Sequence, residues 1–353
     1  MRVIRIVLTG GPCAGKTTML NLMKDYLDRK DIPCLVIPET ATELINGNLK
    51  PYGTYEEIMR FQDAALNKQL TNEEIFSKYA LAAYNDSDLC VIIHDRGLFD
   101  NKAYFAETRD FELMLRNYGL TEIDYLDRYD LVLDLISTAV CKPEAYCFNN
   151  AARYESLEEA VALDAKTTNV WLGHRNMKII PTFLDIEEEK KIILDYLEEI
   201  VYNKQEKRIS RFDITDFSNL EEKFGAVELS DPIDIKDTWL SLSTADGVDC
   251  IVSKRTYKGH NSYTMRLQKE EDDSLVTVYD DRKITEGEYS WFVGTLKNIK
   301  AEEKKEMYFV NNLKLYKVVE TAESISLEIE KVKYDESNVS FNDSSNIWQK
   351  VKH

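Results

Sequence analysis

A glycine-rich loop near the N-terminus constrains the fold of this chain more than any other feature. An apolar run at residues 3–8 precedes the loop, and an amphipathic stretch at residues 16–29 follows it. The loop fits the pattern G-x-x-x-x-G-K-[ST] with Gly10, Gly11, Pro12, Cys13, Ala14, Gly15, Lys16 and Thr17. A chance glycine turn would not require this whole pattern between a strand and a helix. The sequence therefore predicts a P-loop.

The chemistry of such a loop is phosphate binding. Glycines let backbone N–H groups converge on phosphate oxygens, and the start of a helix favours an anion. We expect Lys16 to reach the β- and γ-phosphates and the Thr17 hydroxyl to coordinate Mg²⁺. Together with Thr18, the loop is the predicted binding segment for a nucleoside triphosphate, either ATP or GTP.

Composition and charge narrow the range of partners. The formal net charge of −18 disfavours a broad nucleic-acid or anionic-membrane surface, but it does not exclude a local basic pocket. The sequence contains no run of about 18 apolar residues, so we expect no transmembrane helix. The apolar part of residues 1–10 is too short for a signal peptide. None of the six cysteines forms a C-x-x-C pair, so we expect free thiols in a reducing cytoplasm.

The texture of the sequence changes once along the chain. Residues 1–202 alternate short apolar runs with helical stretches, which predicts a parallel sheet covered by helices. Residues 203–219 are polar and lack a sustained period, so we expect a linker there. Residues 220–335 contain short β-rich runs separated by turns, which predicts a mostly antiparallel β domain. The Ser- and Asn-rich residues 336–353 are expected to form a loose tail.

An acid and an arginine follow the third predicted strand, at residues 89–93. In an open α/β sheet, ligands bind at the carboxyl ends of the strands. We therefore expect Asp95 to hold Mg²⁺, directly or through water, and Arg96 to contact a phosphoryl oxygen or a substrate anion. The alternative is structural: Asp95 would cap the next helix and Arg96 would lie on its surface. His94 is interpreted as structural.

Three further residues are candidates for the acceptor side of such a site. Glu39 follows the second predicted strand, where a carboxylate can orient or deprotonate an acceptor hydroxyl, although a surface Glu at a helix start is equally compatible. Gln62 lies on a long predicted helix and can interact with the edge of a base or an amide, or simply lie on the helix surface. Arg153 is in a segment, residues 149–155, that is either a catalytic lid or an ordinary loop. In a lid, it would stabilise charge on the transferred phosphoryl group.

Several separated motifs carry a family resemblance. The strings are LTGGPCAGKTT (8–18), PET (38–40), FQ (61–62), HDRG (94–97), NNAARYESLEEAVALD (149–164) and WLGH (171–174). Over about residues 1–185 the chain resembles the AAA-type ATP-binding domain of the TRPL-translocation-defect group, whose layout is similar to nicotinamide-riboside and deoxynucleoside kinases. The resemblance implies nucleotide-binding roles for Gly15, Lys16, Thr17, Asp95, Arg96 and Arg153. It also implies that Glu39 is a base and that Gln62 reads a nucleobase.

The second half resembles the CYTH, or triphosphate-tunnel, fold. The matching strings are SKRTYKG (253–259), SYTMR (262–266), ITEGEY (284–289) and LEIE (327–330). Alternate positions on barrel strands point inward, so we expect Lys254, Arg266, Glu328 and Glu330 to share one lumen. Basic groups would bind phosphates there and paired carboxylates a divalent cation. The entry signature Glu-x-Glu-x-Lys is degenerate, with Asn219 in place of its first Glu, which favours binding over hydrolysis. The other interpretation is that these charges solvate an outer sheet face.

Two functions follow from this sequence. One is a Mg²⁺-dependent phosphotransferase, a P-loop kinase or NTPase, acting on a small nucleoside-like or phosphorylated acceptor. The other is a nucleotide-controlled binding protein whose second domain holds polyphosphate or a phosphorylated head group without catalysis. A hexameric AAA motor is disfavoured because no second acid follows Asp95 and no small helical domain comes next.

Overall fold

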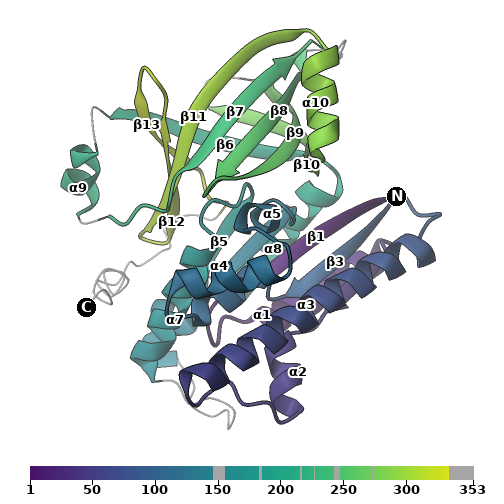
Figure 1. Ribbon diagram of the computed structural model, residues 1–353, viewed down its shortest axis with the longest axis vertical. Coiled ribbons are helices and arrows are strands. Elements are labelled where there is room, and N and C mark those ends of the chain that lie inside the picture. Colours follow the sequence, from purple (N-terminus) through teal and green to yellow (C-terminus); the bar gives the residue numbers. More distant parts are fainter. Residues whose placement is uncertain are drawn as a thin grey trace. The chain divides into compact units, whose positions relative to one another are not determined.

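The computed structural model describes residues 1–145, 156–182, 185–214, 217–225, 227–241, 247–271 and 274–333 (Figure 1). The chain divides into two units. The first comprises Met1–Leu120, Leu131–Trp171 and Asn176–Leu194. The second comprises Thr121–Asp130, Leu172–Arg175 and the chain from Asp195 onward. Two short segments from the P-loop half of the sequence therefore belong to the second unit.

The first unit is built on a five-stranded parallel sheet. The strand order is β2-β3-β1-β4-β5, so the chain crosses over between neighbours. The strands are rich in Ile, Val and Leu, and β4 is buried along its whole length, as expected when helices cover both faces of a parallel sheet. Their bounds are β1 Arg2–Thr9, β2 Cys34–Ile37, β3 Leu89–Asp95, β4 Leu131–Ile136 and β5 Met177–Pro181.

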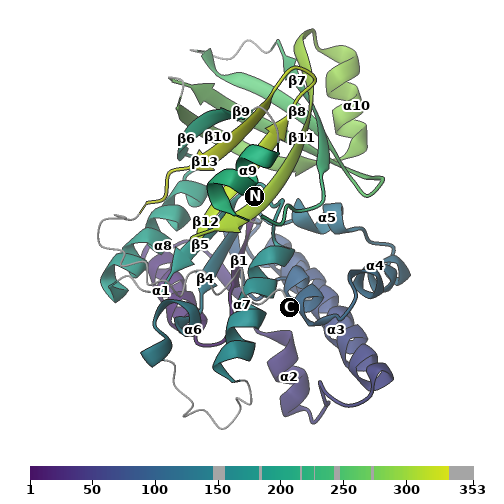
Figure 2. The ribbon, with the colours of Figure 1, turned by 90° about the vertical axis from the view of Figure 1, so that its left-hand side faces the viewer.

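Helices cover both faces of this sheet. Figure 2 shows α1 on one side and α3 and α7 on the other. Helices α3 and α7 both begin with a capping box, Thr54 with Glu57 and Ser156 with Glu159. The helical elements are α1 Lys16–Arg29, α2 Thr40–Asn46, α3 Tyr55–Ala83, η1 Leu98–Tyr104, α4 Thr108–Asn117, α6 Thr138–Cys141, η2 Pro143–Ala145, α7 Leu157–Val170 and α8 Ile186–Val201.

The second unit is a closed antiparallel barrel of eight strands. Their order around the barrel is β10-β6-β13-β12-β11-β7-β8-β9. The strands are β6 Gln205–Ile214, β7 Ile233–Leu240, β8 Asp249–Tyr257, β9 His260–Glu270, β10 Leu275–Ile284, β11 Asn298–Asn311, β12 Lys314–Glu320 and β13 Ile325–Glu330. Among the described residues, the helices that lie wholly within this unit are α5 Glu122–Leu126, α9 Ser218–Phe224 and α10 Glu286–Thr295, and the unit also includes the end of α8 from Asp195.

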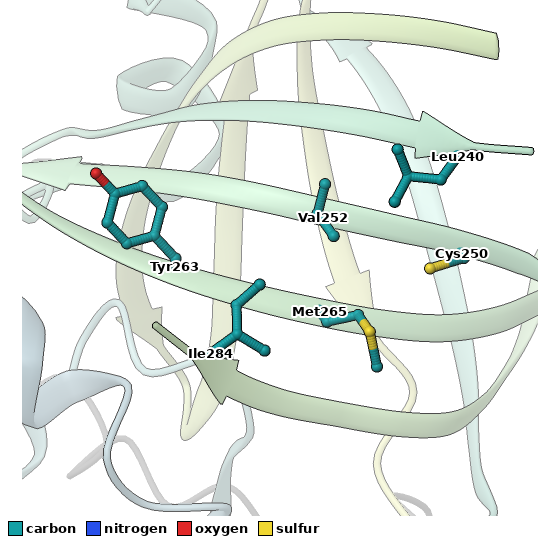
Figure 3. Close-up of a cluster of buried hydrophobic side chains, with 6 residues drawn as sticks. All are labelled: Leu240, Cys250, Val252, Tyr263, Met265 and Ile284. Atoms are coloured by element: carbon teal, nitrogen blue, oxygen red, sulfur yellow. The ribbon is translucent and has the colours of Figure 1, made fainter. Parts of the chain in front are cut away.

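The outer wall of the barrel is apolar where helices cover it. Side chains from β7, β8, β9 and β10 form one buried cluster (Figure 3). Helix α10 packs on this cluster through Tyr289, Phe292 and Val293. A second cluster, on β11, β12 and β13, packs against Leu220 and Phe224 of α9. Because neighbouring strand residues point to opposite faces, the residues between these apolar positions point into the barrel.

Two expectations about the second half are wrong. Residues 205–214, placed in the linker 203–219, form β6 and pair with β10 and β13. Asn219 and its neighbours lie in helix α9 and not on a barrel strand, so they are not a degenerate strand signature. The expected tail, residues 336–353, lies outside the described residues.

No disulfide joins the five cysteines that the structure describes. Among the described residues, no helix combines the length and the apolar character needed to cross a membrane.

Candidate functional site

The phosphate-binding loop connects β1 to α1 through two glycines with positive φ. Gly10 has a φ of 132°, and a Cβ there would lie 1.9 Å from the carbonyl oxygen of Leu135 on β4. Gly15 has a φ of 77° and is the N-cap of α1. At Gly10 the contact with β4 leaves no room for a side chain. At Gly15 a Cβ would meet nothing within 4 Å, so only the positive φ favours glycine there.

Lys16 folds back over the loop. Its Nζ donates to the carbonyl oxygens of Gly10, at 2.9 Å, and Gly11, at 2.8 Å. Burial, then the nearby charge of Arg96, lowers the pKa of Lys16 to about 8, against the opposing effect of three carboxylates. Thr17 and Thr18 are exposed in the first turn of α1. The lysine is thus held by neutral oxygens that phosphates can replace.

Glu39 and Arg96 meet beside this loop. Glu39 follows β2, Arg96 follows β3, and the Arg96 Nε donates to the Glu39 carboxylate at 2.5 Å. Arg96 has a φ of 68°, which is uncommon for a residue with a side chain, and its carbonyl accepts from the Gln69 amide at 3.2 Å. The turn after β3 therefore directs the arginine toward the end of β2. Arg96 is not the surface residue of the structural alternative.

The charges of these groups influence one another. Burial raises the pKa of Asp95, and Glu39 raises it further. For Glu39, burial also acts to raise the pKa, but Arg96 and hydrogen bonds from Thr42 and Arg96 lower it below its usual value. The site thus holds an ionised Glu39 beside Arg96, and an Asp95 carboxyl whose negative charge is only partly compensated.

Asp100 is a residue that sequence reasoning missed. It is buried in η1, where it accepts from the Thr9 hydroxyl and from the Gly97 N–H at 2.6 Å, and it lies 3.7 Å from the Arg96 guanidinium. Its position five residues after Asp95, in the same turn, is the only sequence signal. The Asp100 carboxylate thus supplies a buried negative charge beside the Arg96 guanidinium. Gly97, between them in sequence, has no room for a side chain, because a Cβ would lie 2.6 Å from the ring of Trp171.

The remaining predicted residues of this half are placed as follows. Gln62 is buried on α3, and its amide makes no hydrogen bond within the described part of the chain. His94 is buried beside Glu73, with 3.6 Å between its Nδ1 and the carboxylate, which agrees with a structural interpretation. Arg153 and the segment 149–155 lie outside the described residues.

The barrel interior is a network of charges. Lys317 lies 2.6 Å from Glu328 and 3.5 Å from Glu306, and Lys304 lies 2.9 Å from Asp237. The basic residues of the network are Arg211, Arg255, Arg266, Lys304 and Lys317, and the acidic ones are Asp237, Asp281, Glu306 and Glu328. Charged residues thus replace apolar side chains as the filling of this barrel.

The predicted lumen residues divide between two faces. Met265 and Leu327 belong to the outer clusters, so Arg266 and Glu328 point inward, and Glu330 follows Glu328 by strand alternation. Lys254 is in phase with the outer residue Val252 and lines an outer hollow of about 550 Å³ with Lys236 and Glu303. The prediction that Lys254 shares the lumen is therefore wrong by one position.

Arg255 takes the inward position instead. Its guanidinium donates to Asp127 and, at 2.7 Å, to the carbonyl oxygen of Gly173. Arg175 also contacts Asp127, at 3.2 Å, and Asp281. These contacts attach the segments Thr121–Asp130 and Leu172–Arg175 to the charged lumen, and explain why both belong to the barrel unit.

Comparison with protein families identifies the first half of the chain. The family model described as an AAA domain matches residues 5–188, which is more than half of the sequence. The chain belongs to the AAA domain family. The matched region contains the glycine loop, Glu39, Asp95 and Arg96. For this AAA domain, the P-loop indicates nucleotide binding.

Comparisons with individual proteins add less. No curated protein matches the chain significantly. Among solved structures, the PH1819 protein of Pyrococcus horikoshii is 13% identical, and the match covers 42% of this chain and 90% of PH1819, with a TM-score of 0.30. The PH1012 protein of the same organism is 11% identical, and the match covers 41% of this chain and 88% of PH1012, with a TM-score of 0.29. A conserved hypothetical protein of Pyrococcus furiosus is 15% identical over 42% of this chain and 89% of its own, with a TM-score of 0.29. Such scores do not define a shared fold for this AAA domain protein.

Proposed function

We propose that this protein is a Mg²⁺-dependent P-loop phosphotransferase that moves a phosphoryl group from ATP or GTP to a small, nucleoside-like or phosphorylated acceptor. One observation carries the proposal: Lys16, Glu39 and Arg96 gather at the carboxyl ends of neighbouring strands, with Arg96 held 2.5 Å from Glu39. Phosphoryl transfer depends on positioned charges of this kind around the transferred group. Nucleotide binding alone would not need the carboxylate–guanidinium pair.

Each residue of the loop has a role in this proposal. Lys16 would exchange the carbonyl oxygens of Gly10 and Gly11 for the β- and γ-phosphates. Backbone N–H groups of the loop would bind the remaining phosphate oxygens. Arg96 would contact the transferred group, since a buried guanidinium can bind two oxygens at once.

Thr17 and Asp95 are the residues that would hold Mg²⁺. Both offer oxygen ligands, and Mg²⁺ commonly binds through one or two protein ligands together with phosphates and waters. The raised pKa of Asp95 supports this fit, because a cation would compensate its charge. The described residues contain no group of three or more metal-binding side chains, so the nucleotide would complete the coordination. When bound, Mg²⁺ neutralises negative charge on the phosphates.

The acceptor would bind near Glu39 and Gln62. The lowered pKa keeps Glu39 ionised at neutral pH, so it can accept a hydrogen bond from an acceptor hydroxyl and orient it. Gln62 offers an amide that has no protein partner within the described residues. The resemblance to deoxynucleoside kinases supports these two assignments. The resemblance to the TRPL-translocation-defect group supports a different role for Arg153, which would bind the nucleotide and stabilise charge on the transferred phosphoryl group.

A transfer assay on the full chain tests the proposal. The protein is incubated with Mg²⁺, γ-labelled ATP or GTP, and a panel of nucleosides and nucleoside monophosphates. We expect acceptor-dependent transfer that Glu39→Gln reduces strongly while leaving nucleotide affinity nearly unchanged. Label released only to water, whichever acceptor is supplied, would contradict a phosphotransferase.

The second candidate function, a nucleotide-controlled binding protein, is favoured by the charged barrel. A lumen lined by several basic side chains is a suitable environment for polyphosphate or a phosphorylated head group, and the CYTH resemblance supports the same ligand class. Calorimetric titration of the full chain with tripolyphosphate, with and without Mg-ATP, tests this function. Nucleotide should change the affinity, and equal affinities would separate the barrel from nucleotide control.

A further inference from the structure

A buried carboxylate lies directly beneath the phosphate-binding loop. Asp164 is on α7 and is completely buried. Its Oδ1 accepts the N–H of Gly11 at 2.8 Å and the N–H of Ser137 at 2.9 Å. Gly11 fits because it has no side chain: a Cβ would lie 2.4 Å from this oxygen. Asp164 therefore contacts the loop backbone from the buried interior of the unit.

The contact fixes one particular peptide. The N–H of Gly11 and the carbonyl of Gly10 belong to the same planar unit and point in opposite directions. The N–H is bound by Asp164, and the carbonyl accepts from Lys16 Nζ at 2.9 Å. The orientation of this peptide thus sets where the lysine rests. Ser137 also holds the loop, because its hydroxyl donates to the carbonyl of Pro12, two residues after Gly10.

We infer that Asp164 is a positioning residue, which fixes the Gly10–Gly11 peptide and through it the place of Lys16, so that nucleotide affinity depends on a side chain that never touches nucleotide. The inference rests on the proposed nucleotide binding. Burial raises the pKa of Asp164 to about 6, while the two N–H groups and then Lys16 and Arg96 act to lower it, so the carboxylate is ionised above neutral pH. A charged acceptor holds an N–H more firmly than a neutral one.

Asp134 offers a matched control. It is equally buried and lies near Asp164, whose charge, after burial, raises the pKa of Asp134. The Asp134 carboxylate, on β4, accepts a hydrogen bond at 2.6 Å from the hydroxyl of Thr168, which is on α7 like Asp164. Within the described residues it makes no hydrogen bond to the loop. Replacing Asp134 therefore disturbs the same interior without releasing the Gly11 peptide.

The experiment compares three variants of the full chain at pH 7.5, well below their melting temperatures. Asp164→Ala should raise the Kd for Mg-ATP by about tenfold to a hundredfold, since two buried N–H groups lose their acceptor. Asp164→Asn keeps an oxygen at the same place and should restore most of the affinity. Asp134→Ala should lower the melting temperature with little change in Kd. Equal losses in Asp164→Ala and Asp134→Ala, or wild-type affinity in Asp164→Ala, would overturn the inference.

Amide hydrogen exchange supplies a readout that needs no nucleotide. The Gly11 and Ser137 amides should lose protection in Asp164→Ala and keep it in Asp134→Ala. If the wild type bound no nucleotide, the proposed function would fail, and unchanged Gly11 protection would independently refute the positioning role. If Asp164→Ala does not fold, Gly11→Ala strains the same contact from the other side. It should weaken nucleotide binding as well, and unchanged affinity there would count against the role of Asp164.

Discussion

The two units gather charges in different ways. In the P-loop site Lys16 is bonded to two backbone carbonyls, burial dominates, and its pKa falls to about 8. In the barrel Lys304 is similarly enclosed, but Glu306 and Asp237 outweigh burial and raise its pKa above the usual value. Lys16 is therefore hydrogen-bonded to neutral oxygens, whereas Lys304 is already paired with a carboxylate.

This difference bears on what each unit can bind. A phosphate entering the P-loop replaces neutral carbonyl oxygens and gains a full charge interaction with Lys16. An anion entering the barrel must compete with carboxylates that are already ion-paired, such as Glu328 at 2.6 Å from Lys317. Buried ion pairs are costly to break because the released charge is left uncompensated. We therefore expect tight binding in the first unit and weaker binding in the second.

The largest effect is expected from breaking a barrel pair. Arg175 and Arg266 lower the pKa of Asp281 to about 2, despite burial. Asp281→Ala would leave these guanidinium groups without that counter-charge and should destabilise the barrel by about 3–5 kcal/mol. Urea denaturation of the full chain, followed by tryptophan fluorescence, measures this change. The exposed Asp234 on β7 serves as the control, with Asp234→Ala expected to shift stability by less than about 0.5 kcal/mol.

Lys16→Ala should have the opposite profile. The substitution removes the side chain proposed to contact phosphate and leaves the core intact, so Mg-ATP affinity should fall by about a hundredfold or more while the fold is kept. Nucleotide should raise the melting temperature of the wild type by linkage, but not that of the variant. Equal stabilisation of both proteins by Mg-ATP would remove Lys16 from the nucleotide site.

The pH dependence should separate the two units. In the proposed site Lys16 would bind phosphate as an ammonium group, and its pKa in the free site is about 8. Raising the pH through 8 should therefore weaken nucleotide binding by up to about tenfold per pH unit. Lys16→Arg stays charged and should lack this step. A pH-independent Kd between pH 7 and 9.5 in the wild type would show that the site does not lower the lysine pKa.

The barrel should respond at acid pH instead. Asp281 has a folded pKa of about 2 against a reference of 3.8, so its stabilisation is complete above 3.8 and is lost as the pH falls toward 2. Acid unfolding followed by circular dichroism should show this loss, and Asp281→Asn should shift the midpoint to higher pH.

The local features of the fold were predictable from sequence, and the long-range ones were not. The glycine loop with its flanking strand and helix is one continuous pattern, and Asp95 follows from the end of a buried strand. Asp164 lies 153 residues from Gly11, and nothing near either residue indicates their contact. Its position in the string 149–164 marked it only as part of a resemblance.

The barrel shows a second limit. Strand β6 has large apolar residues only at Ile209, Phe212 and Ile214 and is otherwise polar, so it lacks the regular apolar alternation of an ordinary strand and resembles a linker. Strand β8 is apolar at three successive positions, Cys250, Ile251 and Val252, so alternation could not tell whether Lys254 or Arg255 points inward. Cys250 and Val252 belong to the outer cluster under α10, so by alternation Arg255 points inward.

Replacing the proposed metal ligand Asp95 should have a moderate effect on nucleotide affinity. Asp95→Asn removes a charge from the proposed Mg²⁺ ligands and leaves the loop intact, so it should weaken Mg-dependent nucleotide binding about tenfold, and metal-free binding much less. Titrations with ATP in the presence of Mg²⁺ or of a chelator measure both quantities. Equal shifts in the two conditions would exclude Asp95 as the metal ligand.

The smallest effect is expected at the barrel faces, where it tests the corrected phase of β8. Tripolyphosphate titrations are made in a Lys16→Ala background, so that the P-loop does not contribute. Arg266→Ala removes an inward charge and should weaken binding about threefold to tenfold, limited by the carboxylates that already compete for this lumen. Lys254→Ala, on the outer wall, should change the Kd by less than about twofold. If Lys254→Ala has the larger effect, the ligand binds the outer hollow beside Lys236, and the charged lumen serves the stability of the barrel and not ligand binding.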